Sequence, residues 1–476
     1  MNTSKLILLL QTFSKDEMKA FADYVQSPYF NKREAPVLLL NVLIPYYPDF
    51  AKLKPEKVFK KAFPDKPTYS EAYLRNVLSD LYALAEDFLG IEATRKSPLF
   101  IANLVYRLME KGQYKMAEAN LERMEALLKT NPYTVDIYSM LCYYYKLKMI
   151  FHSLQYQRLL LSKACQEYAT ALRNQCLSDV LESYSTMISL QLIHYHYDFN
   201  TDFLKRFTGM LQPDDVKNEP QLTVLYYTLQ LKIQPDWQTW HNLHDCLQQN
   251  KEKLEGSIIF NSNAELIDFI TQQNKIGNKQ PPGIRERHFA LLEENIALLE
   301  KGKQPYMFNY FEAIVTIGIA LKGSNWAKQY IYLNSPKLSD NLREGLTAYC
   351  LAKLYFYEKD YTETIAILNA ISPFYHHYYF PVKGLLLCAY YEIDNYDAFM
   401  NTINSFKKTL TNHPELAQNS RIAFSNMANI MLKLYHLRIQ YNPKTANQLE
   451  QMIKNQELSL DVRKWIESKF NDLKPN

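Results

Sequence analysis

Glycine is scarce in this chain. Only 11 of its 476 residues are glycine, well under half of the usual share of about 7%. Few glycines mean few positions with positive φ, and hence few tight hairpins and few loops that cradle phosphate groups. Tyrosine is abundant instead, with 37 residues. Few turn-forming residues and many large aromatic side chains favour long packed helices, so we predict an all-α fold.

Motifs that mark common enzyme classes are also missing. The chain contains no GxGxxG, GxxxxGK[ST], HExxH or GxSxG, each of which has a defined chemical role. We therefore predict no catalytic residues, no cofactor and no enzymatic activity. The six cysteines lie far apart, with no CxxC pair and no zinc spacing. Such a pattern is typical of reduced thiols in a cytoplasmic protein.

Long apolar runs and a strong net charge are absent as well. The longest apolar runs fall far short of the roughly 18 residues that span a bilayer, and the N-terminus lacks the features of a signal peptide. The net charge of +4 is small for this length, so the molecule as a whole shows no preference for nucleic acid or anionic membrane. We expect a cytoplasmic protein without a membrane partner.

Histidine pairs occur at three places and invite a metal-site interpretation. They are His194 with His196, His241 with His244, and His376 with His377. Zinc sites usually place histidines at helical spacing with a further ligand close by, as in HExxH. None of the pairs has that spacing beside a glutamate, so we expect packed or surface histidines and no metal site.

A short turn recurs along the chain. The stretches "EKGQYKMAEANL" (110–121) and "EKDYTETIAIL" (358–368) share Glu-Lys, a small or polar pair, a tyrosine and an apolar face. Tyr361 lies 35 residues from both Trp326 and Tyr396 (361 − 326 and 396 − 361). Apolar residues at helical spacing flank these turns. A fixed period near 34 residues is typical of stacked helical hairpins.

These segments resemble tetratricopeptide repeats. The best match is 101–132, where Gly112 and Tyr114 occupy the turn and Ala117 takes the small position of the second helix. The resemblance implies an α-solenoid of helical hairpins that binds a partner on its concave face. The residues at the small position in three later units depart from the pattern: Thr364, Phe399 and Gln329.

Residues 1–95 lack the turn marker, and we predict a separate, compact helical N-terminal domain there. Capping boxes are expected at Ser14 to Glu17 and at Thr68 to Glu71. The stretch "LLQTFSKDEMKAFADYVQSPYFNK", taken with "YLRNVLSDLYALAEDFL", resembles the start of an uncharacterised bacterial family without an assigned activity.

The remaining chain is predicted to form two blocks of repeats. Degenerate tetratricopeptide-like units are expected over 96–271, and further units with polar C-terminal capping helices over 288–476. Between them, "QQNKIGNKQPPGIRER" (272–287) combines glycine, proline and polar residues and is expected to interrupt the stack. The number of units between 133 and 320 cannot be counted from the sequence, and neither can the oligomeric state.

The resemblance also implies a binding face. If the late repeats stack as in that family, the inward side of their first helices presents Tyr349, Lys353, Phe356, Cys388 and Tyr391. A lysine among aromatic side chains suits a short acidic or C-terminal peptide. We therefore predict a non-catalytic scaffold or adaptor that binds a partner's peptide or helix on its concave face.

An alternative function starts from a basic segment. Residues 52–67 carry six lysines against only Glu56 and Asp65. A short helix, a loop and a longer helix there would suit a variant helix-turn-helix in a nucleic-acid-associated regulator whose repeats sense a partner. The residues that would contact phosphates are Lys54, Lys57, Lys60, Lys61 and Arg75. A solvated lysine face on a surface helix explains the same residues, and the sequence leaves both interpretations open.

Overall fold

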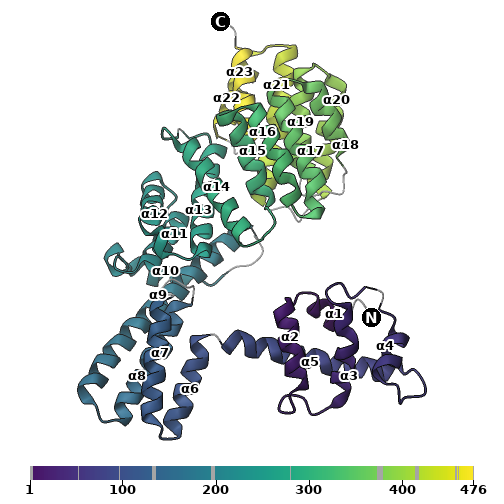
Figure 1. Cartoon of the computed structure of the whole chain (residues 1–476). Coiled ribbons are helices and arrows are strands. Elements are labelled where there is room, and N and C mark those ends of the chain that lie inside the picture. Colours follow the sequence, from purple (N-terminus) through teal and green to yellow (C-terminus); the bar gives the residue numbers. More distant parts are fainter. Residues whose placement is uncertain are drawn as a thin grey trace. The chain divides into compact units, whose positions relative to one another are not determined.

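The computed structural model describes residues 4–51, 53–95, 97–130, 136–193, 199–278, 280–371, 379–412, 418–455, 458 and 460–474. These residues form α-helices and short 3-10 turns, with no strand among them (Figure 1). The predicted all-α class is therefore confirmed. The chain divides into two compact units: residues 1–131 with 139–171, and residues 132–138 with 172–476.

The first unit contains the helices up to the beginning of α9. They are α1 (Lys5–Leu10), α2 (Lys15–Gln26), α3 (Glu34–Leu43), α4 (Pro55–Ala62), α5 (Glu71–Arg95), α6 (Pro98–Glu110), α7 (Tyr114–Thr130), α8 (Ile137–Leu154) and α9 (Arg158–Ile193). Helix α9 is a single element of 36 residues that belongs to both units. It occupies a whole repeat period without a turn, which explains why no hairpin could be located there from the sequence.

The second unit contains the remaining helices. They are α10 (Asp202–Met210), α11 (Pro220–Ile233), α12 (Trp237–Asn250), α13 (Gly256–Lys275), α14 (Ile284–Lys301), α15 (Phe308–Lys322), α16 (Ser324–Asn334), α17 (Asp340–Tyr357), α18 (Tyr361–Ala370), α19 (Tyr379–Glu392), α20 (Tyr396–Asn412), α21 (Gln418–Ile439), α22 (Pro443–Asn455) and α23 (Leu460–Asp472). Short 3-10 turns join some of them, including η4 (Ser335–Lys337).

Helices α1 to α5 enclose a hydrophobic core of their own. The capping box predicted at the start of α2 is present: the Glu17 amide donates to Ser14 Oγ at 3.1 Å and the Ser14 amide donates to the Glu17 carboxylate at 2.7 Å. The box predicted at Thr68 is wrong by two residues, because α5 begins at Glu71 and the Tyr73 amide donates to Ser70 Oγ. A side-chain acceptor can satisfy only the amides of the first turn that it precedes.

The recurring turn has the same backbone geometry at three predicted positions. Gly112, Lys359 and Asp394 all have positive φ, of 69°, 66° and 59°. At each, two amides return to carbonyls of the preceding helix; for example, Lys359 N donates to Phe356 O and Asp360 N to Tyr355 O. This pairing ends a helix by satisfying its last carbonyl groups. Tyr114, Tyr361 and Tyr396 each begin the second helix of a hairpin.

The Trp326 unit follows a different register. Its turn is the single residue Gly323, with φ of 87°, and α16 begins two residues before Trp326. Ala327 is therefore the small buried residue of the second helix, whereas Gln329, predicted for that position, is exposed. Trp326 instead lies over Gly318 of α15, where an added Cβ would come within 2.0 Å of the indole ring.

Consecutive helices of the second unit pack in pairs: α11 with α12, α13 with α14, α15 with α16, α17 with α18, α19 with α20, and α21 with α22 (Figure 1). First helices of neighbouring pairs also contact each other, as α15 does α17 and α17 does α19. One hydrophobic cluster runs from Val224 to Leu386. The predicted break at 272–287 therefore does not separate two cores, because α13 and α14 on its two sides pack together.

The C-terminal helices were predicted to form a polar cap. Helix α23 buries Val462, Ile466 and Phe470 on one side, while Lys464 and Ser468 are exposed. It contacts α13, α19 and α21, so it is a packed element of the second unit. The local sequence is polar enough to suggest an outer cap, but contacts from distant helices cover its apolar side.

Candidate interaction site

The predicted partner-binding residues on α17 lie inside the stack of helices. Tyr349 is buried, and Lys353 has only 7% of its surface exposed. The Lys353 ammonium forms an ion pair with Glu312 of α15 and donates to Thr316 Oγ1 at 2.9 Å. Lys353 thus bonds the neighbouring helix, and its charge is not offered to a partner on an open face.

The other three predicted residues belong to a second hydrophobic cluster, formed with α20, α21 and α23. Cys388 and Tyr391 are buried, and Phe356 is half-buried. The Tyr391 ring meets Tyr435 and Trp465 edge-on at centroid distances of 5.2 and 5.1 Å. Burial raises the pKa of Tyr391 to about 12. The expectation that these residues line an exposed groove is therefore wrong for four of the five: all but Phe356 are covered by neighbouring helices.

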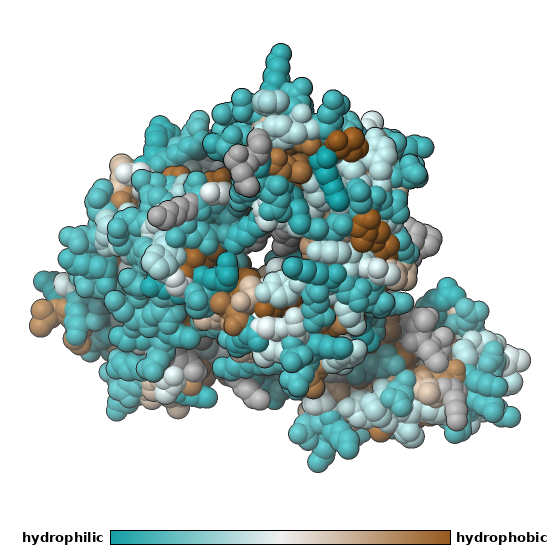
Figure 2. Space-filling model, turned by 90° about the horizontal axis from the view of Figure 1, so that it is seen from above, coloured by the Kyte–Doolittle hydropathy of each residue, from teal (hydrophilic) through white to brown (hydrophobic). Residues whose placement is uncertain are grey.

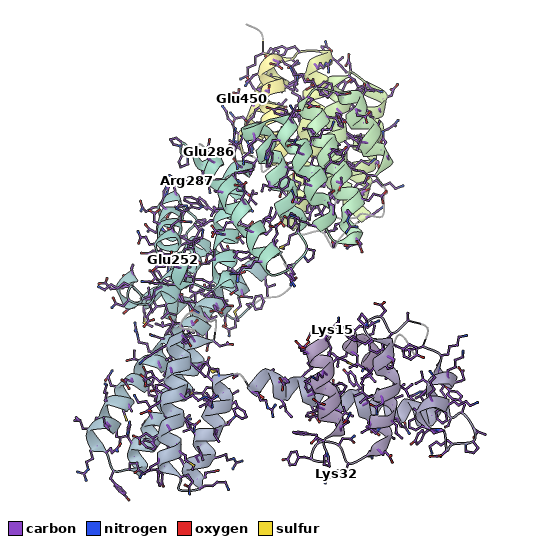
Figure 3. All side chains as sticks on the ribbon, viewed as in Figure 1. Lys15, Lys32, Glu252, Glu286, Arg287 and Glu450 are labelled. Carbon is purple, nitrogen blue, oxygen red and sulfur yellow. The ribbon has the colours of Figure 1, made fainter. Side chains whose placement is uncertain are left out.

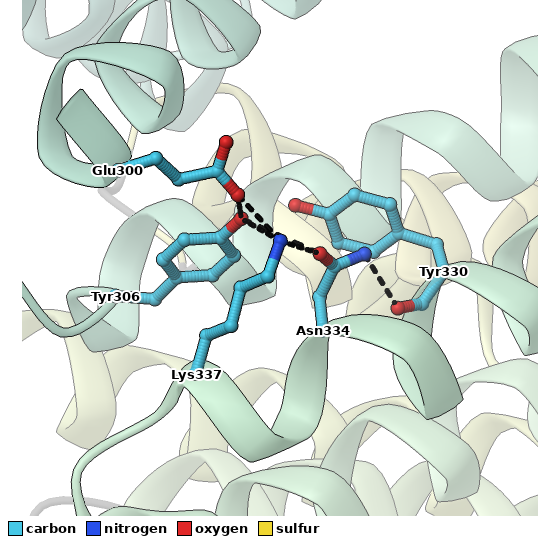
Figure 4. A network of polar contacts seen from close by, with 5 residues as sticks. All are labelled: Glu300, Tyr306, Tyr330, Asn334 and Lys337. Carbon is cyan, nitrogen blue, oxygen red and sulfur yellow. Dashed lines mark hydrogen bonds and ion pairs between the residues drawn. The ribbon is translucent and has the colours of Figure 1, made fainter. Parts of the chain in front are cut away.

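A polar network joins the end of α14 to η4 (Figure 4). Lys337 forms an ion pair with Glu300 and donates to Asn334 Oδ1 at 2.9 Å, while the Tyr306 hydroxyl donates to Glu300. Hydrogen bonds from Lys337 and Tyr306 lower the pKa of the Glu300 carboxyl. The groups partner one another across two connections between helices, which gives the network a structural role.

Of the three histidine pairs, only His241 and His244 lie among the described residues, and they do not form a metal centre there. His244 Nδ1 lies 3.2 Å from Asp245 Oδ1, and its ring stacks on Trp240. Within the ranges that the structure describes, no three histidine, cysteine or acidic side chains gather closely enough to hold a metal ion. The other predicted histidines, His194, His196, His376 and His377, lie outside the described residues.

An exposed apolar surface lies where α8 turns into α9. Tyr156 sits in the turn with φ of 55°, and 91% of its surface is exposed. Leu159 follows at the start of α9, with 85% exposed, and Leu154 and Leu160 are also exposed. Side chains of this kind normally avoid water in contiguous groups, and such groups mark interaction sites. Hydrophobic residues on the face shown in Figure 2 lie mostly singly or in small groups among hydrophilic ones.

A groove of about 320 Å³ lies beside this turn, between the two helices. Its lining is Met149, Ile150, Ser153, Leu154, Leu161 and Cys165. The helices are held together by an ion pair of 3.3 Å between Lys148 and Glu167. One turn earlier on α8, Tyr144 donates to Glu125 of α7 at 2.7 Å. We call the groove together with Tyr156, Leu159 and Leu160 the hairpin-end surface.

The rim of the hairpin-end surface is basic. Residues 137–166 contain Lys146, Lys148, Arg158 and Lys163 but no aspartate or glutamate. Lys148 and Lys163 pair with Glu167 at 3.3 and 3.9 Å, so the positive charge of the rim comes from Lys146 and Arg158. Lys146 precedes Met149 and Ile150 by three and four residues, so it lies on the face of α8 that lines the groove. Arg158 precedes Leu161 by three residues, so it lies on the face of α9 that lines the groove. Both side chains are exposed, so the surface combines apolar contact area with positive charge.

Sequence reasoning missed this surface because it searched for the repeat pattern. The turn after α8 does not share the Glu-Lys marker. One signal was available: a stretch of thirty residues without an acidic side chain in a chain with 50 of them. Tyr156 and Leu159 beside Arg158 would then have indicated an exposed, basic and apolar turn.

The residues predicted for nucleic-acid binding lie in the same unit. Lys54, Lys57, Lys60 and Lys61 are exposed on or just before α4. Arg75 is exposed on α5, but its guanidinium is 2.7 Å from the Glu71 carboxylate. The structure therefore groups the four lysines and gives Arg75 a local acidic partner.

Comparison with known proteins adds no family. No protein-family model matches this chain, and no curated protein shows detectable sequence similarity to it. The resemblances to tetratricopeptide repeats and to a bacterial family thus stay predictions. Among the described helices, none combines the length and apolar character that crossing a bilayer requires.

Proposed function

We propose that this protein is a non-catalytic interaction scaffold or adaptor that binds an apolar, acidic segment of a partner protein at the hairpin-end surface. The observation that supports this proposal is the exposure of Tyr156 and Leu159 beside an apolar groove with a basic rim. The exposed thiol of Cys165 suits a reducing compartment, so we place the protein in the cytoplasm.

The physical reason is the free energy of covering apolar area. Each Å² of apolar surface removed from water contributes roughly 25 cal/mol, and tyrosine is enriched among residues that dominate binding energy. A partner helix with two apolar anchors would place one in the groove and one against Leu159. Acidic residues flanking the anchors would meet Lys146 and Arg158, which speeds association and orients the partner.

Site-specific photocrosslinking tests this proposal. A photoreactive residue is placed at position 159 and, in a separate variant, at position 333, because Leu333 is a similarly exposed leucine on α16. We expect a specific protein partner to crosslink from 159 and not from 333. The partner segment is then titrated against the purified chain, where Leu159→Glu should weaken binding at least tenfold and Leu333→Glu should not.

Three results would contradict the proposal. Equal crosslinking from both positions would show that any exposed leucine suffices. Unchanged affinity in the Leu159→Glu variant would remove the hairpin-end surface as the binding site. Binding to anionic vesicles that depends on Leu159, without a protein partner, would instead make this surface a membrane contact.

A further inference from the structure

Helix α4 has a face that its fold leaves entirely to solvent. Val58, Phe59 and Ala62 of this helix are buried in the core of α1 to α5. On its other side, Lys57, Lys60 and Lys61 are exposed, and Lys54 is exposed at its N-cap. Spacings of three and four residues place 57, 60 and 61 next to one another. We call these four lysines the α4 face.

The α4 face differs from the arginines of the N-terminal helices. Arg33 pairs with Asp80 at 2.6 Å, Arg75 with Glu71 at 2.7 Å, and Arg95 with Glu92 at 3.4 Å. No such ion pair within the described chain involves any lysine of the α4 face. With Glu56, the one acidic residue of α4, the four lysines leave a net charge of +3 (4 − 1) at this place on the surface, whereas the arginine charges are compensated locally.

An exposed aromatic ring lies in the connection that follows α4, where the carboxylates of Glu71 and Glu56 also act on it. Tyr69, in the connection from α4 to α5, is 41% exposed, and its ring packs edge-on against Phe59 of α4 at 5.4 Å. In the same connection, the Lys66 ammonium lies 4.2 Å from the centroid of the Tyr73 ring. Cations that track a backbone, together with a ring on which a base can stack, are the elements of single-strand recognition.

A duplex-reading motif fits these residues less well. Such a motif would place the first turn of α5 in the major groove. Glu71 lies at that position and holds Arg75, so a carboxylate would approach the phosphates. The eight residues of α4 measure about 12 Å along the helix axis. Lys57, Lys60 and Lys61 on the helix and Lys54 at its N-cap can contact three or four phosphates of one strand.

We propose that the α4 face and Tyr69 bind single-stranded nucleic acid, with the lysines on successive phosphates and the tyrosine ring stacked on a base. This site is independent of the hairpin-end surface and of the partner proposed for it. It recognises the phosphate backbone and one base face, and therefore has little sequence preference.

Fluorescence anisotropy with the full-length protein tests this proposal. The probes are a labelled mixed-sequence 20-nucleotide single strand, as DNA and as RNA, and the corresponding duplex. We expect single strands to bind more tightly than the duplex. With three to four phosphate contacts, affinity should fall about 20- to 50-fold between 50 and 200 mM salt.

Two variants locate the site. The triple variant Lys57→Gln, Lys60→Gln and Lys61→Gln should reduce the slope of log affinity against log salt by about two. Tyr69→Ala should lower affinity for single strands about tenfold and leave the salt slope unchanged. The matched control is Lys15→Gln, Lys19→Gln and Lys32→Gln, which removes the same charge; Lys15 and Lys32 lie at α2 and before α3, apart from α4 (Figures 1 and 3).

Several outcomes would overturn the proposal. Equal weakening by the two triple variants would mean that net charge alone attracts the strand. Binding that is insensitive to salt, or equally tight for the duplex and unaffected by Tyr69→Ala, would exclude the proposed mode. Loss of binding to phosphatidylserine vesicles in the α4 variant, with oligonucleotide binding unchanged or absent, would assign these lysines to lipid headgroups.

Discussion

Two regions of the molecule contain the same kinds of side chain but differ in how far these are buried. One is the joint between α15, α17 and α19, and the other is the end of the α8–α9 hairpin. The joint contains Tyr349, Lys353 and Tyr391, all buried by adjacent helices. The hairpin end contains Tyr156, Arg158 and Leu159, all exposed. Helix α17 has first-helix neighbours on both sides, whereas the α8–α9 end has an open groove. An aromatic and basic pattern therefore indicates a binding site only where no neighbouring helix covers it.

The largest expected difference between the two regions is the cost of losing a tyrosine. Tyr391→Ala should lower the free energy of unfolding by about 3–5 kcal/mol, because a residue that is only 4% exposed leaves a cavity. Tyr156→Ala should change it by less than about 0.5 kcal/mol, because its ring is in water. Denaturation by urea, followed by circular dichroism, measures both. Similar shifts for the two variants would invalidate the comparison.

The second largest expected difference is the loss of stability when an ion pair of each region is broken. Lys353→Ala should cost about 3 kcal/mol, because it leaves the Glu312 carboxylate in the joint without its cation. Lys148→Ala should cost less than about 1 kcal/mol, because both partners of the Lys148–Glu167 pair keep contact with water.

The double variant Lys353→Met and Glu312→Leu provides the control, and urea denaturation measures all three proteins. We expect the double variant to recover most of the stability that Lys353→Ala loses, because neither charge then remains in the joint. If the double variant is as unstable as Lys353→Ala, lost packing rather than the unpaired carboxylate explains the cost.

The smallest expected effect is the gain in stability from placing glycine in a turn with positive φ, and it should be the same in both regions. Lys359 and Tyr156 both occupy turns with positive φ, of 66° and 55°, a conformation that costs a residue with a side chain about 1 kcal/mol or more. Lys359→Gly and Tyr156→Gly should therefore each raise the free energy of unfolding by about 1 kcal/mol. Gly112→Ala, at the matching turn with φ of 69°, should lower it by a similar amount. Thermal denaturation measures all three variants, and unequal gains would show that packing modifies the turn.

Several local features could be predicted from the sequence because nearby residues determine them. The capping box at Ser14 depends on residues three apart, and the turns before Tyr114, Tyr361 and Tyr396 depend on how a helix ends. The amphipathic face of α5, from Leu74 to Phe88, is buried as its spacing predicts. The prediction for the Trp326 unit was wrong because its turn is shorter. Counting residues from Trp326 assigned Gln329 to the small buried position that Ala327 occupies.

The sequence by itself determined that this protein is all-α, that hairpins form at the recurring turns, and that the α4 lysines are exposed, since each depends on composition or on interactions within a few residues. Only the tertiary structure decided which apolar and basic surfaces remain open. Lys353 forms an ion pair with Glu312, 41 residues away, and the Tyr391 ring packs against Trp465. The groove at the α8–α9 end, in contrast, stays open. Burial depends on the helices that pack from elsewhere in the chain, and residue type alone does not carry that information.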